Sequence, residues 1–489
     1  MALSGGDPVQ ISKAPGGISG FLLSPDGSKV ALWADRPVGA KTIDDVQPKA
    51  PGEAGLARVY EQLFVRHWDT WADGQRSQIF VMPLAGGPAV SVMGGLVGDS
   101  PSKPYGGAEE LSWSRDGKTI FFALREAGRI EPLSTNLDIF AAPADGSAAP
   151  VNLTDANDAT DTMPVVSPDG KWLAYAAMKR PAYEADRLVL MLRNIATGET
   201  KALTEGWDRS IASIAWEANG KSLLVTANDV LDNPVFRVDA ASGKVMRLTE
   251  KGHTGSVVPL PKGGFVYALD SIQSPADFWK MPGGKGKPVR LTDVNATKLA
   301  GVDDVSVERY SFKGANGDTV WGQIVKPKGI SGKMPVAFLV HGGPQGSFND
   351  SWSYRWNPKA FAAHGYAAVI VDFHGSTGYG QAFTDSINKD WGGKPLEDLK
   401  LGLAAAAAKD AQVDAGNACA LGASYGGYMM NWIEGQWADG FKCIVQHDGV
   451  FDARAMAYET EELWFDEWEH GGPYYEKPEE FEKWNPVNH

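Results

Sequence analysis

A serine among small residues lies between two apolar stretches, in the pattern G-x-S-x-G at 422–426 with a further glycine at 427. The stretch before Ser424, "NACALGA" (417–423), predicts a strand, and the stretch after it predicts a helix. A serine at such a corner is held in a strained turn, and side chains larger than glycine beside it would collide with the strand and the helix. The turn exposes Oγ of Ser424 and directs the backbone N–H of Tyr425 into the same space. The pattern therefore favours a nucleophile elbow over a structural turn.

Glycines also follow an earlier apolar stretch, because His341-Gly342-Gly343-Pro344 comes directly after "VAFLV" (336–340). Small residues there allow backbone N–H groups to approach an oxyanion that develops on a carbonyl. The loop precedes the serine region as it does in α/β-hydrolases, and this favours an oxyanion role over an ordinary glycine-rich strand exit. His341 precedes the nucleophile, so we expect it to pin the loop rather than to act as the base.

No histidine after the serine has the expected context of a catalytic base. In α/β-hydrolases the acid and then the histidine follow the serine, and only His447, His470 and His489 do so here. His447 comes too early, because its acid would have to be Glu434 or Asp439. His470 lies in an aromatic-rich segment with no strand before it, and His489 is the last residue. We expect these three to serve packing or the surface, and the acid and base to lie beyond the end of the chain, which alone would then be inactive.

The stretch after residue 302 alternates short apolar strands with helices, which predicts an α/β layer with a mostly parallel sheet. The predicted strands are 334–340, 367–373, 417–423 and 441–446, and the clearest predicted helix is 395–411. We expect residues 303–489 to form a three-layer α/β-hydrolase domain that is incomplete at its C-terminal end.

The first 302 residues repeat a hairpin pattern, in which an apolar strand enters a D-G or N-G turn and a second apolar strand leaves it. A second pattern, Leu-Thr after a strand, recurs at steps of 50, 45 and 43 residues from Leu153 to Leu203, Leu248 and Leu291. Four short strands in each such period predict a β-propeller over residues 1–302, with six to eight blades and seven as the expected number. A plain array of β-sandwiches is the alternative. The segment "RVYEQLFVRHWDTW" (58–71) breaks the pattern, and its apolar spacing predicts an inserted helix.

The composition is that of a soluble globular protein, since 43% of the 489 residues are hydrophobic and 22% are charged. The net charge of −14 argues against nucleic acid and against an anionic membrane surface as partners. Cys419 and Cys443 lie in apolar stretches, so we expect buried reduced thiols rather than a disulfide. No CxxC or HExxH spacing occurs, and we expect neither a metal nor a cofactor.

The sequence contains no segment that predicts membrane insertion or export. The longest apolar runs, such as "YAAVIV" (366–371), are much shorter than the ~20 residues that span a bilayer. The first residues, "MALSGGDPVQ", contain neither the basic nor the apolar part of an export signal. We therefore expect a cytoplasmic protein, or a periplasmic or secreted one from which a signal has been removed.

Several stretches resemble the prolyl oligopeptidase family of serine peptidases, in its acylaminoacyl-peptidase branch; they are "HGGPQGSF" (341–348), "DFHGSTGYGQAF" (372–383), "DWGGKPLEDLKLGL" (390–403) and "GASYGGYMMNW" (422–432). "RVYEQLFVRHWDTW" (58–71) and "HDGVFD" (447–452) are most similar to the bacterial dipeptidyl peptidase V group of that branch. The resemblance covers nearly the whole chain. It implies a seven-bladed propeller that caps an α/β-hydrolase domain and admits short peptides, and a further C-terminal stretch with the catalytic Asp and then His.

The resemblance also implies roles for individual residues. Ser424 matches the nucleophile, and the backbone N–H groups of Tyr425 and Gly343 match the donors to the oxyanion.

Three further residues match substrate-binding positions. Glu61 resembles an acidic residue that holds the free N-terminus of a peptide, with a solvated helix glutamate as the alternative. Trp464 and Trp468 lie where relatives build the pocket for the residue before the scissile bond, with ordinary core packing as the alternative.

We expect a serine exopeptidase that removes dipeptides or acylated residues from the N-terminus of short peptides through an acyl-enzyme on Ser424. A carboxylesterase on the same fold is the alternative enzyme, although a small ester needs no propeller as a sieve. A non-catalytic propeller and hydrolase scaffold is the alternative of a different class. The expected partners are short peptides. Two further partners stay open as possibilities: a second copy of the chain in a homodimer, and a separate C-terminal fragment that carries Asp and His.

Overall fold

The computed structural model describes residues 5–47, 57–284, 286–302 and 304–489. Its contacts divide the chain into two units, the first ending at Glu205 and the second beginning at Gly206. The first four residues, part of the segment compared with an export signal, lie outside the described residues. In the part of the chain that is described, no helix has the length and apolar character of a bilayer-spanning segment.

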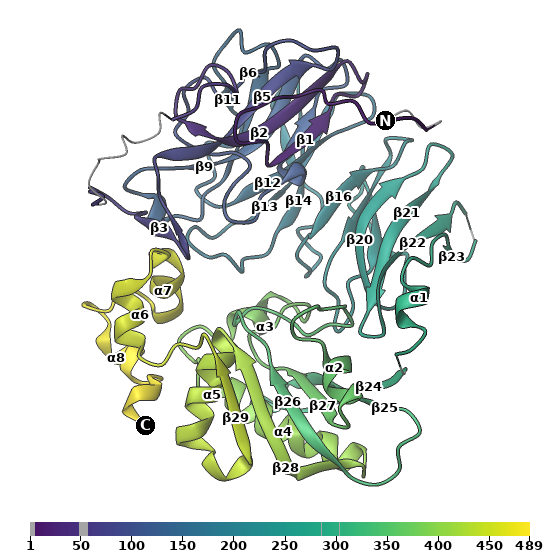
Figure 1. Cartoon of the computed structure of the whole chain (residues 1–489), viewed down its shortest axis with the longest axis vertical. Coiled ribbons are helices and arrows are strands. Elements are labelled where there is room, and N and C mark those ends of the chain that lie inside the picture. Colours follow the sequence, from purple (N-terminus) through teal and green to yellow (C-terminus); the bar gives the residue numbers. More distant parts are fainter. Residues whose placement is uncertain (1–4, 48–56, 285, 303) are drawn as a thin grey trace. The chain divides into compact units, whose positions relative to one another are not determined.

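Three antiparallel sheets form most of the first unit (Figure 1). The first contains β1 (Gly20–Leu23), β2 (Lys29–Pro37), β5 (Gln75–Pro83) and β6 (Val90–Ser91). The second contains β7 (Gly98–Asp99), β8 (Leu111–Trp113), β9 (Thr119–Glu126), β10 (Asp138–Pro143) and β11 (Val151–Asn152). The third contains β12 (Asp161–Val166), β13 (Trp172–Ala177), β14 (Val189–Asn194) and β15 (Thr200–Ala202).

The second unit begins with two more sheets of the same kind. The fourth sheet contains β16 (Ser213–Trp216), β17 (Ser222–Thr226), β18 (Val235–Asp239) and β19 (Val245–Arg247). The fifth contains β20 (His253–Pro259), β21 (Gly264–Ser271), β22 (Ser274–Pro282) and β23 (Val289–Arg290), and the short helix α1 (Ala296–Leu299) follows it. Four-stranded antiparallel meanders of this kind are the blades of β-propellers.

The described residues form five such sheets before β24, in place of the seven blades that the repeat period predicts. Dividing the length by a uniform period fails because the first sheet extends from Gly20 to Ser91, with a long insertion between β2 and β5. The predicted D-G and N-G turns are present, and their glycines have φ between 65° and 73°; they are Gly27, Gly117, Gly170 and Gly220. A domain boundary at 302/303 stays a prediction.

Each Leu-Thr pair fastens the last strand of a sheet to the strand before it. In the third sheet, Leu203 donates its N–H to the carbonyl of Leu190 at 2.8 Å, and Thr204 Oγ1 accepts the N–H of Leu190 at 2.9 Å. The same hydroxyl-to-backbone bond, at 2.8 to 2.9 Å, is made by Thr154, Thr249 and Thr292. The hydroxyl therefore pairs a backbone N–H where the short last strand of the sheet has ended, and this explains the repeated sequence.

The insertion at 58–71 does not form the predicted helix. Its strands β3 (Arg66–His67) and β4 (Thr70–Trp71) pair as an antiparallel hairpin, while residues 57–65 are bends and irregular chain. Tyr60 stacks on Trp71 with ring centroids 6.3 Å apart. The prediction was wrong because Trp71 lies in a hairpin strand, which suits the strand preference of aromatic side chains, and Tyr60 packs on it from the irregular stretch before the hairpin.

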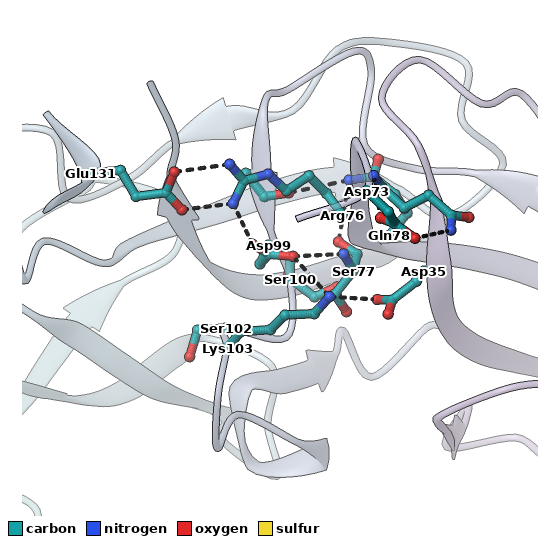
Figure 2. Close-up of polar contacts among 12 residues, drawn as sticks. Asp35, Asp73, Arg76, Ser77, Gln78, Asp99, Ser100, Ser102, Lys103 and Glu131 are labelled. Atoms are coloured by element: carbon teal, nitrogen blue, oxygen red, sulfur yellow. Dashed lines mark hydrogen bonds and ion pairs between the residues drawn. The ribbon is translucent and has the colours of Figure 1, made fainter. Parts of the chain in front are cut away.

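Arg76 of β5 links the first and second sheets (Figure 2). Its guanidinium donates to the carboxylate of Glu131 at 2.6 and 2.8 Å and to Asp99 of β7 at 2.8 Å. The side chains of Glu131 and Asp99 are only 2% and 4% exposed. Lys103 lies nearer the solvent, 2.9 Å from Asp35. Such bidentate, largely buried pairs are the strong kind of ion pair.

The last sheet has the order β24-β25-β27-β26-β28-β29, antiparallel from β24 to β27 and parallel from β27 to β29. Its strands are β24 (Val305–Lys313), β25 (Thr319–Pro327), β26 (Met334–Val340), β27 (Ala367–Asp372), β28 (Val413–Ala423) and β29 (Cys443–His447). The four strands predicted after residue 302 are therefore confirmed. The helices are α2 (Pro358–Ala363), α3 (Gln381–Asp385), α4 (Lys394–Lys409), α5 (Tyr425–Gln436), α6 (Ala453–Glu459), α7 (Leu463–His470) and α8 (Pro478–Glu482).

Helices cover both faces of this sheet. Phe338 of β26 belongs to the apolar cluster that includes α4 and α5, whereas its neighbour Leu339 belongs to the cluster that includes Ala362 of α2. Side chains of a strand alternate between faces, so α2 lies on one face and α4 and α5 on the other. This is the predicted three-layer arrangement.

Cys419 and Cys443 form a disulfide, so the expectation of reduced thiols is wrong. The two residues are direct partners in the parallel pairing of β28 with β29, with Cα atoms 4.6 Å apart. Disulfides need Cα atoms within about 7 Å, and only the strand order, which the sequence spacing does not reveal, brings the two thiols that close.

Candidate active site

Ser424 occupies the corner between β28 and α5 with φ 57° and ψ −120°. A positive φ at a residue other than glycine costs about 1–3 kcal/mol and persists only where the surrounding structure enforces it. Ser424 is exposed, whereas Tyr425 after it is buried. The predicted strained corner with an accessible hydroxyl is therefore confirmed.

The glycines around the serine are required by close approach of backbone atoms. A Cβ atom on Gly422 would overlap the carbonyl of Gly426, and one on Gly426 would overlap the carbonyl of Val340 in β26. A Cβ atom on Gly427 would lie 2.5 Å from the carbonyl oxygen of His447. The turn can therefore form only with glycine at these positions.

The glycine loop after β26 packs directly against the serine. A Cβ atom on Gly342 would lie 3.2 Å from Cβ and 3.7 Å from Oγ of Ser424. The next residue, Gly343, is exposed and has φ 130°. On the other side, the first amides of α5, beginning with Tyr425, have no acceptor within the helix and favour a negative charge. The exposed Oγ thus lies between a glycine backbone and a helix N-terminus.

His341 pins the glycine loop, as the sequence predicted. Its Nδ1 lies 2.8 Å from the carbonyl of Gly342 and its Nε2 lies 2.8 Å from Oγ of Ser376. A carbonyl only accepts, so Nδ1 carries the proton and Nε2 accepts from the hydroxyl. Burial lowers the pKa of His341 against the opposing effect of Asp372, which keeps the ring neutral and engaged away from Ser424.

Asp372, at the end of β27, fastens the far end of the same loop. Its buried carboxylate accepts hydrogen bonds from Ser347 Oγ at 2.5 Å, from the N–H of Phe348 at 3.0 Å and from the hydroxyl of Tyr379 at 2.9 Å. Burial raises the pKa of Asp372, and the three donors oppose that shift. The loop is thus held at both ends by buried polar groups.

The three histidines after the serine lie in different surroundings. His447 is half-exposed and its Nε2 lies 2.9 Å from Asp448, while its backbone carbonyl accepts the N–H of Ser424. His470 is buried and stacks on Phe481 with centroids 3.8 Å apart. His489 lies edge-on against Trp432. Among the described residues, no side chain is hydrogen-bonded to Ser424 Oγ.

Comparison with known proteins identifies the family. The profile of the prolyl oligopeptidase family matches residues 352–489, which include the corner at Ser424. The probable dipeptidyl-peptidase 5 of Trichophyton verrucosum is 33% identical over 511 residues, covering 98% of this chain and 69% of that protein. Dipeptidyl-peptidase 5 of Schizosaccharomyces pombe is 33% identical over 470 residues, covering 91% of this chain and 66% of that protein. The chain belongs to the prolyl oligopeptidase family of serine peptidases.

The fold of this member of the prolyl oligopeptidase family also has a counterpart among solved structures. The acylaminoacyl peptidase of Pyrococcus horikoshii matches it with a TM-score of 0.77 at 18% identity, over 96% of this chain and 69% of that chain. At that identity the likeness concerns the fold, which is a β-propeller joined to an α/β-hydrolase domain.

The residues expected to bind substrate in this prolyl oligopeptidase family member are placed as follows. Glu61 is exposed and lies in a bend before β3 rather than on a helix. Trp464 of α7 is only 2% exposed, which favours the packing alternative, whereas Trp468, one turn later, is half-buried. The sequence analysis did not single out Trp391, which packs on Tyr425, or Glu469, which accepts hydrogen bonds from Trp391 and Gln345. The acid-rich, aromatic-rich stretch 461–470 was the available signal for Glu469.

Proposed function

We propose that Ser424 is the nucleophile of a serine exopeptidase that releases dipeptides or acylated residues from the N-terminus of short peptides. The observation that carries the proposal is the exposed Ser424 at φ 57°, packed against Gly342 at the N-terminus of α5. This is the arrangement in which a hydroxyl and two backbone amides meet one carbonyl.

In the proposed reaction, Ser424 Oγ attacks the scissile carbonyl carbon while a base takes its proton. The negative charge that develops on the carbonyl oxygen is held by the N–H groups of Tyr425 and Gly343. The C–N bond then breaks, the amine leaves with a proton, and water hydrolyses the acyl-enzyme. His341 takes no proton in this scheme, because both its ring nitrogens are engaged in holding the loop.

The choice of an exopeptidase is supported by the names of the relatives, which are dipeptidyl-peptidases, and by that of the structural neighbour, an acylaminoacyl peptidase. Within the proposal, exposed Glu61 would bind the free N-terminus of the peptide, and Trp468 would line the pocket for the residue before the scissile bond. Both assignments are separable from the role of Ser424.

The test is labelling of the complete gene product with a fluorophosphonate, followed by mass spectrometry of the labelled peptide. The wild type should be labelled at Ser424, and Ser424→Ala should not be labelled. Ser242→Ala, which changes an exposed serine in the turn after β18, is the matched control and should be labelled like the wild type. Absence of labelling in the wild type would overturn the proposal in favour of a non-catalytic scaffold.

Substrate assays then separate the enzyme classes. A dipeptidyl arylamide, an acetyl-aminoacyl arylamide and a simple aryl ester are compared by kcat/KM. Preference for either arylamide supports the exopeptidase, and a preference for the ester with no arylamide cleavage would identify a carboxylesterase. Loss of dipeptidyl cleavage in Glu61→Gln, with acetyl-aminoacyl cleavage kept, would assign Glu61 to the peptide N-terminus.

A further inference from the structure

A buried carboxylate outside the expected catalytic residues contacts one residue of the glycine loop and one residue that packs on Tyr425. Glu469, in the last turn of α7, is only 1% exposed. Its Oε1 accepts a hydrogen bond from Nε2 of Gln345 at 2.7 Å, and its Oε2 accepts one from Nε1 of Trp391 at 2.8 Å. Its backbone carbonyl accepts the N–H of Lys389 at 3.0 Å. The side chain is thus fixed at each oxygen.

The chemistry of the two donors explains why a carboxylate is placed here. A carboxylate removed from water is costly unless it is hydrogen-bonded. Gln345 and Trp391 each offer an N–H, and an ionised carboxylate is the side chain that accepts at both oxygens without presenting a hydrogen to either donor. Bonds to a charged acceptor are also shorter and stronger than neutral ones.

The first donor belongs to the glycine loop. Gln345 lies two residues after Gly343, and the loop folds back on itself so closely that a Cβ atom on Gly343 would lie 2.5 Å from the N atom of Gln345. The following residue, Gly346, accepts the N–H of Thr377 through its carbonyl at 2.9 Å. A shift of Gln345 would therefore move the backbone of Gly343.

The second donor holds the residue after the serine. The indole of Trp391 meets the ring of Tyr425 edge-on, with centroids 5.3 Å apart and planes at 81°. The hydroxyl of Tyr425 donates to the backbone carbonyl of Trp391 at 2.5 Å. Trp391 therefore sets where Tyr425, and with it the first amide of α5, is held.

We propose that Glu469 is a positioning residue that fixes the distance between the two amides of the oxyanion site, those of Gly343 and Tyr425. The inference rests on the proposed function, because it gives Glu469 a role only if an oxyanion forms between these amides. Oxyanion donors act within a narrow range of about 2.7–3.1 Å, so a displacement of a few tenths of an ångström weakens catalysis. One carboxylate that contacts both supporting side chains removes that freedom.

The decisive variant is Glu469→Gln, which keeps the shape and turns one acceptor into a donor. The introduced NH₂ group faces either Gln345 or Trp391, and that contact is lost. We expect kcat to fall ~10–100-fold with KM changed less than ~3-fold, because loss of a whole oxyanion donor costs ~10²–10³-fold in kcat. Glu467→Gln, the same change on the same helix, is the matched control and should leave both constants unchanged.

A reciprocal exchange separates positioning from a merely structural role. In the double variant Gln345→Glu/Glu469→Gln, the amide at 469 accepts from Trp391 and donates to the new carboxylate at 345. Both hydrogen bonds are then restored, and kcat should recover to within ~5-fold of the wild type. Gln345→Ala removes only the contact between Glu469 and the glycine loop, and it should lower kcat. If Glu469→Gln does not fold, Gln345→Ala replaces it as the test variant.

The rate of fluorophosphonate labelling of the complete gene product distinguishes the outcomes, since the phosphonyl oxygen occupies the oxyanion site. Slower labelling of Glu469→Gln with recovery in the double variant supports positioning. Equal rates in the wild type, Glu469→Gln and Gln345→Ala would overturn the inference and leave the proposed function intact. No labelling of the wild type would overturn the proposed function, and the inference with it.

Discussion

The backbone of Gly342 lies so close to the side chain of Ser424 that a Cβ atom on Gly342 would be 3.2 Å from Ser424 Cβ, although the two residues are 82 positions apart in the sequence. The contact arises because β26 and β28 are parallel neighbours, so the loop that leaves one strand meets the turn that leaves the other. Parallel strands of an open sheet bring their carboxyl ends to one edge, and sites in α/β folds form there.

The first prediction concerns Gly342→Ala. The added methyl group would lie 3.0 Å from the carbonyl oxygen of Ala423 and 3.2 Å from Ser424 Cβ, so one of the two backbones must move by a few tenths of an ångström. We expect a fall in kcat/KM of ~10-fold or more with little change in stability. Gly206→Ala, where a methyl group meets no atom within 4 Å, is the control. Equal activity of both variants would show that the loop adjusts freely.

The second prediction concerns Arg76→Met, which leaves the buried Glu131 without the cation it pairs with and leaves Asp99 with only Lys103, 3.7 Å away. Breaking a buried ion pair by removing one partner costs about 3–5 kcal/mol, and the partial exposure of Arg76 places the expected loss near the lower value. Urea unfolding of the variant measures it. Lys179→Met, whose ion pair with Glu205 is largely exposed, should cost less than ~1 kcal/mol. Similar losses in the two variants would contradict the difference expected from burial.

Local sequence patterns predicted the elements that depend on local chemistry. The corner at Ser424 requires glycine beside it, and the hairpin turns require positive φ, so both leave a residue-level signature. The Leu-Thr repeat marked the end of the last strand of each of four sheets because the threonine hydroxyl accepts a backbone N–H of the strand before it.

Features that depend on which elements become neighbours were missed. Cys419 and Cys443 are joined only because β28 and β29 are adjacent. Glu469 contacts Gln345 from 124 residues away, and no periodicity in either segment encodes that meeting. The seven-blade count is not confirmed, since the described residues form five sheets before β24 and a uniform period cannot register an insertion inside a blade. The predicted helix at 58–71 was wrong because aromatic spacing suits a hairpin as well as a helix.

The third prediction concerns Thr204→Val, which replaces a buried hydroxyl by a methyl group and leaves the N–H of Leu190 without its acceptor. An unsatisfied buried backbone group costs about 1–3 kcal/mol, so the free energy of unfolding should fall by that amount. Thr197→Val changes an exposed hydroxyl in the turn before β15 and should alter stability by less than ~0.5 kcal/mol. Urea unfolding compares the two variants. An unchanged free energy of unfolding in Thr204→Val would mean that water replaces the threonine hydroxyl as the acceptor of the Leu190 N–H.

The last prediction concerns the pH dependence contributed by His470. Burial lowers its pKa to about 4, against the carbonyl of Asp466 that accepts from its ring, whereas in the unfolded chain the ring titrates near ~6.5. The folded chain therefore binds fewer protons than the unfolded chain between these values. The contribution of the neutral ring to the free energy of unfolding is fully present above about pH 6.5. This contribution is lost as the pH falls towards 4, and the total loss is at most about 3 kcal/mol.

His470→Phe isolates this contribution, because its ring can keep the stacking on Phe481 but does not titrate. The Asp466 carboxyl lies 3.6 Å from the ring of His470, and burial raises its pKa to about 7, so by itself it gives stability that falls as the pH rises. Asp466 is present in both proteins, so the difference between their stability curves reports His470. From pH 7 to pH 4 the free energy of unfolding of the wild type should fall by about 2–3 kcal/mol more than that of His470→Phe, as measured by urea unfolding at each pH. The control His364→Phe changes an exposed histidine, and its stability curve should follow that of the wild type. Parallel curves for the wild type and His470→Phe would show that the ring titrates alike in the folded and unfolded chains, and burial would then not exclude His470 as a base.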